Sequence, residues 1–238
     1  MNRVIKVAVY QGYLDVLKTY WSNVPKDKIP LLMDIATCAL AALGGHFEVL
    51  IWLRRQGCPW GPSACDGAAE GGHLEILKWL RSEGCPWKAK VGWGAAMNGH
   101  LEVLKWLRSE GCPWDGRKCT RYAAYGGHFE ILKWLRSEGC PWDTEALAHA
   151  AEGGHLEILK WARCEGCPLD AKTCAGAAKG GHLEILKWLR SEGCPWDNST
   201  WYYSYSAAKS LREWLEENNC PTSGVLYGSQ NIEFRSEI

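Results

Sequence analysis

Residues 173–197 read T-C-A-G-A-A-K-G-G-H-L-E-I-L-K-W-L-R-S-E-G-C-P-W-D, and variants of this stretch recur through most of the 238-residue chain. The repeat histidines follow one another at intervals of 27, 27, 28, 27 and 27 residues. They are His46, His73, His100, His128, His155 and His182. Six Cys-Pro pairs keep the same spacing, and a seventh begins at Cys220. A fixed period of this length is typical of repeat proteins, in which each unit is one supersecondary structure.

Each unit is predicted to form two helices. From Leu74 to Glu83, apolar residues and Trp79 line one face and charged residues fill the rest, which is the periodicity of an amphipathic helix. The Ala-rich segment before it predicts a shorter helix that ends at Gly71-Gly72, because glycine tolerates positive φ. An aspartate is expected to cap the short helix of the following unit. The candidates are Asp115, Asp143, Asp170 and Asp197.

Such a helix pair cannot bury its apolar faces alone, but stacked neighbours can. The repeats therefore predict an all-α solenoid of helix-turn-helix units. Leucine-rich repeats have a similar period but need the strand signature L-x-x-L-x-L-x-x-N, which no copy shows.

The unit resembles the ankyrin repeat, whose pattern runs T-P-L-H-x-A-A-x-x-G-H-x-E-V-V-K-L-L-L-x-x-G-A-D-V-N. Residues 173–178 resemble its first helix, residues 181–187 its turn and second helix, and residues 193–197 its G-A-D-V-N segment. The resemblance covers about residues 1–220 and implies an ankyrin-like α-solenoid. The family period is about 33 residues, so the copies here are shorter. The missing residues fall in the β-hairpin loop, as in short arrays of giant viruses and some protists.

The repeat pattern also predicts the domain organisation. We expect one solenoid over 1–220, with a degenerate N-terminal cap over about 1–30, six repeats over about 31–196, and a degenerate C-terminal cap over about 197–220. The first copy carries Tyr13 in place of the histidine, and residues 207–215 have lost the Gly-Gly-His. Residues 221–238 show no repeat and are expected to fray.

Composition excludes several functional classes. The chain has 27 Lys+Arg and 27 Asp+Glu, so its net charge is zero, which argues against a nucleic-acid-binding protein. A local basic cluster keeps nucleic-acid binding as an alternative. It comprises Lys88, Lys90, Arg117, Lys118 and Arg121. No apolar run reaches the roughly 18 residues of a membrane helix, and the N-terminus lacks the pattern of a signal peptide.

The twelve cysteines and the repeat histidines are interpreted as structural. Equivalent positions of stacked helices lie roughly 8–10 Å apart, whereas a disulfide needs Cα atoms within about 7 Å. Zinc needs four ligands around one ion. We therefore expect no metal, no cofactor and no catalytic residue, but reduced, buried thiols in a reducing compartment, which is the cytoplasm or nucleus, including that of a host cell. Cys164 forms a C-x-x-C with Cys167 and is expected to be an exposed thiol, with a redox role as the alternative.

The tryptophans form two series. Those of the longer helices are expected in the core. Those that follow Cys-Pro form either a buried ladder or an exposed row for ligand stacking. The recurring E-x-x-K-x-x-R charges of the longer helix predict a solvated outer face.

Positions that differ between copies are free to carry specificity. They lie in the short helix and the loop before it, which face the concave groove in ankyrin arrays. The central copies hold the residues most typical of interface hot spots. These partner-binding candidates are Trp93, Met97, Arg121, Tyr122, Tyr125 and His149. The alternative is that Tyr122 and Tyr125 only fill space left by neighbouring glycines.

The sequence predicts a non-catalytic protein–protein interaction scaffold that binds an unidentified protein partner on its concave face. We expect it to be monomeric and to bind neither nucleic acid nor membrane. Two alternatives remain: an adaptor that recruits a target to a ubiquitin ligase, and a metal-binding or redox protein that uses Cys and His.

Overall fold

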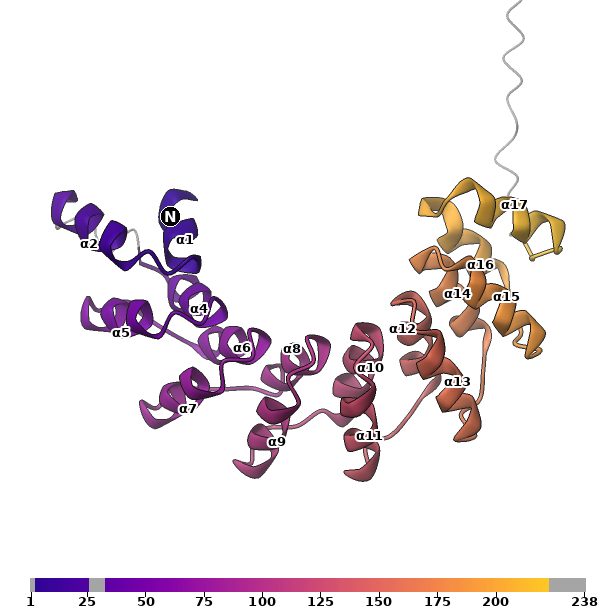
Figure 1. Cartoon of the computed structure of the whole chain (residues 1–238), viewed down its shortest axis with the longest axis horizontal. Helices are drawn as coiled ribbons and strands as arrows, with labels where there is room; N and C mark the ends of the chain where they lie inside the picture. The colour runs from indigo at the N-terminus through magenta and orange to yellow at the C-terminus, as the bar shows by residue number, and fades with distance from the viewer. Residues whose placement is uncertain (1–2, 26–32, 223–238) are drawn as a thin grey trace, which may run out of the picture. The chain divides into compact units, whose positions relative to one another are not determined.

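The computed structural model describes residues 3–25 and 33–222. Within these residues all regular structure is helical: 16 α-helices, one 3-10 helix and no strand (Figure 1). The all-α prediction is confirmed. The loops that correspond to the ankyrin hairpins form no β-structure in the described residues.

The chain divides into two compact units, Met1–Ala146 and Leu147–Ile238, and the boundary falls inside the helix Thr144–Glu152 (α12). Each unit is a stack of helix pairs. The single solenoid over residues 1–220 stays a prediction. The expected frayed tail lies outside the described residues, except for Pro221 and Thr222.

The first unit holds five helix pairs in its described residues, and in each pair the first helix is the one that packs against its neighbours in the stack. The first helices are α1 (Arg3–Tyr10), α4 (Ile35–Leu43), α6 (Pro62–Glu70), α8 (Val91–Met97) and α10 (Gly116–Gly126). The second helices are α2 (Leu14–Asn23), α5 (Phe47–Arg55), α7 (Leu74–Ser82), α9 (Leu101–Ser109) and α11 (Phe129–Ser137).

The second unit repeats the same plan. After α12 come α13 (Leu156–Cys164), α14 (Ala171–Gly180), α15 (Leu183–Ser191), α16 (Asn198–Tyr203), the 3-10 turn η1 (Ser204–Ser206) and α17 (Lys209–Glu217). The first helices α14 and α16 pack side by side.

All four predicted aspartate caps accept a backbone hydrogen bond at the start of a first helix. Asp115 Oδ1 accepts from the Lys118 amide at 3.1 Å, and Asp170 Oδ1 from the Thr173 amide at 3.3 Å. Asp143 and Asp197 do the same for Ala146 and Ser199, both at 2.9 Å. These bonds satisfy amides that have no partner inside the helix.

Small residues allow the first helices to lie close together. A Cβ on Gly67 of α6 would lie 2.5 Å from the Ala39 carbonyl oxygen of α4. The second helices supply the larger core residues: Ile76, Leu77 and Leu80 of α7 are at most 4% exposed. The Ala-rich sequence of the first helices is therefore a packing requirement.

The Gly-Gly-His turn locks each repeat to its neighbour. His73 Nε2 donates to the Leu43 carbonyl of the preceding repeat at 3.0 Å. Gly71 has a φ of −80°, but its Cβ would lie 2.4 Å from the same carbonyl oxygen. Gly72 has a φ of +77°, and its Cβ would lie 2.5 Å from the ring of His100. Only the second glycine has the expected positive φ; the first is required for close approach.

The same bond recurs at four other repeat histidines, at 2.8–3.0 Å. The pairs are His46 with Tyr10 O, His100 with Glu70 O, His128 with Met97 O, and His182 with Glu152 O. Because a carbonyl oxygen only accepts, Nε2 must carry the proton in each pair. The structural interpretation of these histidines agrees with this geometry.

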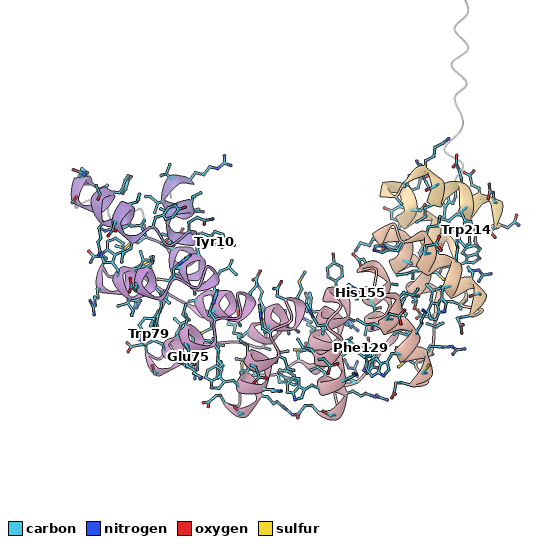
Figure 2. The ribbon with its side chains drawn as sticks, in the orientation of Figure 1. Tyr10, Glu75, Trp79, Phe129, His155 and Trp214 are labelled. Carbon is cyan, nitrogen blue, oxygen red and sulfur yellow. The ribbon has the colours of Figure 1, made fainter. Side chains whose placement is uncertain are left out.

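The arginine of the second helix holds the loop that follows it. Arg81 Nη1 donates to the Cys85 carbonyl at 2.7 Å, and its guanidinium carbon lies 3.9 Å from the centroid of the Trp87 ring. Trp87 meets Trp106 of the next repeat edge to face, at 5.7 Å between centroids. The prediction of a purely solvated charged face is therefore wrong for the arginines. It holds for Glu75 and Lys78, which form an exposed ion pair on α7. Figure 2 shows Glu75 beside Trp79 on this helix.

Both tryptophan series are half-buried and pack against each other, so the helix tryptophans, which we expected in the core, are only partly buried. The loop tryptophans form a ladder rather than an exposed row. Further edge-to-face pairs are Trp60 with Trp79, Trp114 with Trp134, and Trp196 with Trp214.

Candidate functional site

The predicted partner-binding residues of the first unit lie on α8 and α10, which are neighbouring first helices. Trp93 of α8 stacks on Tyr122 of α10 with 6.1 Å between ring centroids and 24° between ring planes. Lys118 Nζ lies 4.0 Å from the centroid of the Trp93 ring. Because Lys118 and Tyr122 are four residues apart on α10, they share one helix face. Two aromatic rings and one cation are thus brought together.

Trp93 is half-buried, and its indole Nε1 is buried without a hydrogen-bond partner among the described residues. Tryptophan N–H groups are usually paired when they are buried. Unpaired buried groups are uncommon in folded proteins. Among the described tryptophans only Trp21, which packs edge to face on Trp52, has the same kind of unpaired buried donor.

Arg121 is engaged within the chain. Its Nη2 lies 2.6 Å from Asp143 Oδ2, and its Nε lies 3.4 Å from Asp143 Oδ1. Burial alone would raise the pKa of the Asp143 carboxyl. The hydrogen bonds from Arg121 and from the Ala146 amide together outweigh burial, so the pKa lies below its usual value. Arg121 thus ties α10 to the cap at the start of α12, a structural role beside the predicted one.

The other three candidates, Met97, Tyr125 and His149, lie on α8, α10 and α12 respectively. Met97 ends α8 and is 39% exposed, while its carbonyl oxygen accepts the His128 bond. Tyr125 is half-buried on α10. His149 is half-buried on α12 and belongs to the second unit. The structure therefore joins Trp93 and Tyr122 directly, and adds Lys118 to them.

The residue nearest to the open side of Gly94 is Glu70, because a Cβ on Gly94 would lie 3.0 Å from the Cβ of Glu70. Nearby on α6, burial raises the pKa of the Asp66 carboxyl, although the charges of Lys90 and Lys88 oppose this rise. The surface around α8 therefore carries both signs of charge.

A second aromatic surface, which we did not predict, lies in the last repeat. Tyr202, Tyr203 and Tyr205 are 66%, 43% and 62% exposed. Tyr202 meets Tyr203 and Tyr205 edge to face at 5.4 and 6.4 Å. The signal was the run W-Y-Y-S-Y-S at the first helix of that repeat, which we interpreted only as a degenerate cap.

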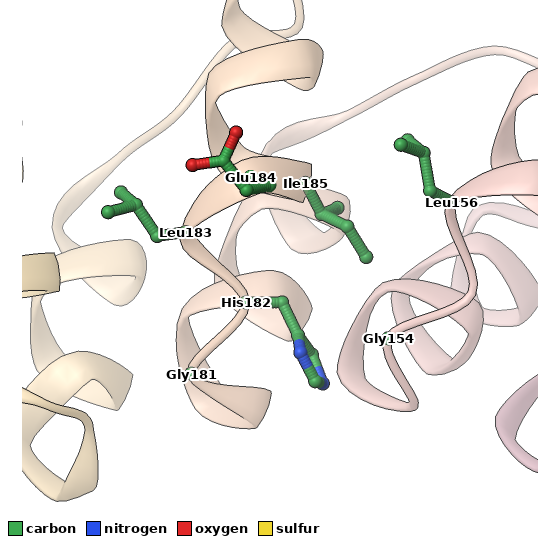
Figure 3. A pocket seen from close by; sticks show the side chains of 7 residues that line it. All are labelled: Gly154, Leu156, Gly181, His182, Leu183, Glu184 and Ile185. Carbon is green, nitrogen blue, oxygen red and sulfur yellow. The ribbon is translucent and has the colours of Figure 1, made fainter.

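A shallow pocket of about 370 Å³ lies in the second unit (Figure 3). It is lined by Gly154, Leu156, Gly181, His182, Leu183, Glu184 and Ile185. The His182 ring is bound to the Glu152 carbonyl, and a Cβ on Gly154 would lie 2.7 Å from it. The pocket is thus the groove of one Gly-Gly-His lock, and its histidine is already used in stacking.

The cysteines and histidines form no cluster of three or more metal-ligating side chains in the part of the chain that the structure describes. All twelve cysteines are free thiols; eleven are buried and Cys164 is exposed. None of the described helices is long and apolar enough to cross a membrane.

Comparison with known proteins agrees with the repeat architecture. Residues 93–173 match the family model of ankyrin repeats (3 copies). Among solved structures, the human ASB11 ankyrin repeat domain is similar, with a TM-score of 0.55 and 19% sequence identity, over 78% of this chain and 99% of that chain. At this identity the likeness shows the fold. No curated protein matches the chain.

Proposed function

We propose that this chain, which carries ankyrin repeats and folds as an all-α solenoid, is a non-catalytic scaffold whose first helices bind a protein partner. Ankyrin repeats are generally protein–protein interaction modules. The partner-binding region is the central aromatic surface, which we define as Trp93, Met97, Lys118, Tyr122 and Tyr125. His149 belongs to the second unit, and we propose it separately as a contact residue of that unit.

The contrast between recurring residues and residues found in a single copy supports this proposal. Residues that recur among the copies are used for stacking: five of the repeat histidines bind carbonyl groups, Gly12, Gly45, Gly72, Gly99 and Gly154 face histidine rings, and Arg54, Arg81 and Arg190 bind the Cys-Pro loops. Trp93 and Tyr122 occur in single copies and take no part in those contacts. Aromatic residues that are not needed for stacking are free to act as hot spots of an interface.

The Trp93–Tyr122 stack carries the proposal. Two stacked rings present a large, rigid contact area that loses little conformational freedom on binding. Lys118 adds a positive charge beside the rings, so the surface suits a partner segment that combines apolar side chains with a carboxylate.

The test compares three baits in a cross-linking pull-down from cells that express the protein naturally: the unchanged chain, Tyr122→Ala with Tyr125→Ala, and Tyr202→Ala with Tyr203→Ala. The proposal expects one set of partners to be lost from the first variant and kept by the second. Circular dichroism of each bait confirms that it is folded. If the Tyr202 variant alone loses the partners, the binding surface lies in the last repeat and the central assignment is wrong.

A further inference from the structure

Two buried thiols of one repeat lie in contact. Cys174 is on α14, and Cys194 is in the loop after α15. Their sulfur atoms are 3.5 Å apart, and the residues are 0% and 1% exposed. Equivalent cysteines of neighbouring repeats are too far apart for a disulfide. Cys174 and Cys194 are not equivalent: they occupy different positions of the same repeat, and the helix-turn-helix fold brings these two positions together.

The pairing follows a spacing of twenty residues that recurs in the sequence. Cys38 and Cys58 have this spacing, as do Cys65 and Cys85. In both of these pairs the neighbouring thiol raises the pKa of the first cysteine and lowers that of the second, as it does for Cys174 and Cys194. Three repeats therefore hold a cysteine pair of this spacing whose thiols influence each other.

Other Cys-Pro cysteines depart from it, and they provide internal comparisons. The residue twenty positions before Cys167 is Leu147. Cys119 and Cys140 are twenty-one residues apart, because the repeat that contains them is 28 residues long instead of 27. A hydrogen bond from Trp114 acts on Cys140, whose pKa is nevertheless raised, mainly by burial.

We propose that Cys174 and Cys194, and by the same spacing Cys38–Cys58 and Cys65–Cys85, are oxidisable dithiol pairs that close to disulfides when hydrogen peroxide reaches them. The sulfurs of Cys174 and Cys194 must approach from 3.5 Å to about 2.05 Å. This approach is a side-chain movement within one repeat, and no other segment lies between the two atoms.

The chemistry balances with one peroxide per pair. The Cys194 thiolate attacks one peroxide oxygen, the O–O bond breaks, and the leaving oxygen takes a proton to form water. The sulfenic acid at Cys194 is then attacked by Cys174, the S–O bond breaks, and a second water leaves with the remaining proton. Two thiols are oxidised by two electrons and the peroxide is reduced.

The surroundings favour Cys194 as the attacking group. The hydrogen bond from Cys174 lowers the pKa of the Cys194 thiol, and the charge of Arg190 acts in the same direction; burial and the charge of Asp170 oppose this, but the net pKa is lowered. The same contact raises the pKa of Cys174. The thiolate is the nucleophilic form, so the two sulfurs have different reactivity.

The bridge would join the first helix of a repeat to the loop after its second helix. It would close a loop of about twenty residues and thereby restrict the unfolded chain. Oxidation would therefore stabilise the individual repeats that hold a pair, and leave the repeat with Cys167 and Leu147 unchanged.

The test uses the full chain with Cys164→Ser, which removes the exposed thiol and its intermolecular reactions. The folded protein is treated with hydrogen peroxide, the remaining thiols are alkylated, and tryptic peptides are analysed by mass spectrometry. We expect residues 173–179 to be linked to residues 191–209 with the loss of two hydrogens, and Cys167 to be recovered as an alkylated thiol. The melting temperature should rise by about 5–10 °C and return when dithiothreitol is added.

A Cys174→Ser variant in the same background is the matched control. It should show no link at Cys194 and a smaller rise in melting temperature. If that variant does not fold, the reversible link in the parent protein decides the question. The proposal is overturned if the 173–179 and 191–209 peptides stay unlinked, or if Cys167 is linked as often as Cys174, which would indicate oxidation of unfolded chains.

Discussion

Replacing Gly72 by alanine tests the lock between repeats, because Gly84 offers a control with nearly the same backbone. Gly72 and Gly84 have φ values of +77° and +75°. A Cβ on Gly72 would lie 2.5 Å from the His100 ring, whereas a Cβ on Gly84 would meet nothing within 4 Å. Both substitutions place an L-residue in the left-handed region, which costs roughly 1–2 kcal/mol.

Only Gly72→Ala also displaces a histidine. The His100 ring would move away and lose its 3.0 Å bond to the Glu70 carbonyl. A hydrogen bond contributes about 0.5–1.5 kcal/mol, and repacking around an added methyl group about 1 kcal/mol or more. We therefore expect Gly72→Ala to cost about 2 kcal/mol more in free energy of unfolding than Gly84→Ala.

Urea unfolding followed by tryptophan fluorescence measures this difference. The free energy of unfolding falls by about 2 kcal/mol per M of urea. The urea concentration at the unfolding midpoint should therefore be roughly 1 M lower for Gly72→Ala than for Gly84→Ala. Repeating both substitutions with His100→Ala completes a double-mutant cycle, in which the extra cost at position 72 should disappear. Equal midpoints for the two glycine variants in the unchanged background would refute the lock.

Three further outcomes follow from contacts described above. Trp134→Ala should lower the free energy of unfolding by about 2–3 kcal/mol, because Trp134 is only half-buried and a fully buried tryptophan is worth roughly 3–5 kcal/mol. Tyr122→Ala should lower it by less than half as much but weaken partner binding. Urea unfolding measures the loss of stability, and titration calorimetry measures the loss of binding. Burial lowers the pKa of His100, so its contribution is present above about pH 6.5 and is lost as pH falls through the depressed pKa; His100→Gln should flatten this acid dependence in melting experiments. Arg81→Met should cost about 1–2 kcal/mol in urea unfolding, and Arg81→Lys nearly as much, since lysine cannot both donate to the loop carbonyl and cover the Trp87 ring.

The repeat period was sufficient to predict the helices, their order and their caps. Asp115 and Asp170 were assigned from one rule, because an N-cap is a local interaction within four residues. The role of Gly71 was not local. Its backbone is ordinary, and only the carbonyl oxygen of another repeat, 2.4 Å from where its Cβ would lie, requires glycine.

The candidate site was predicted in part. Variation among the copies pointed to Trp93 and Tyr122, and the structure stacks them. The variation among copies could not reveal that Asp143 binds Arg121. Asp143 was already assigned to a helix cap, and the sequence does not show that its second carboxylate oxygen binds another partner. The contact between Cys174 and Cys194 was missed because two different positions of the repeat meet only when the helix pair folds.

The histidine lock has a consequence for how such a chain changes length. The copies that begin with α4, α6 and α8 supply both halves of their joints: a carbonyl at the end of the first helix for the following histidine, and a histidine for the preceding carbonyl. A segment of 27 residues that is duplicated in phase would therefore join its neighbours through contacts already present, without compensating substitutions. Deletion of a whole copy would leave an equally complete joint. The copies at 74–87 and 183–196 have the same sequence, so recombination between them would alter the length of the array while keeping the second helix and its Cys-Pro loop intact.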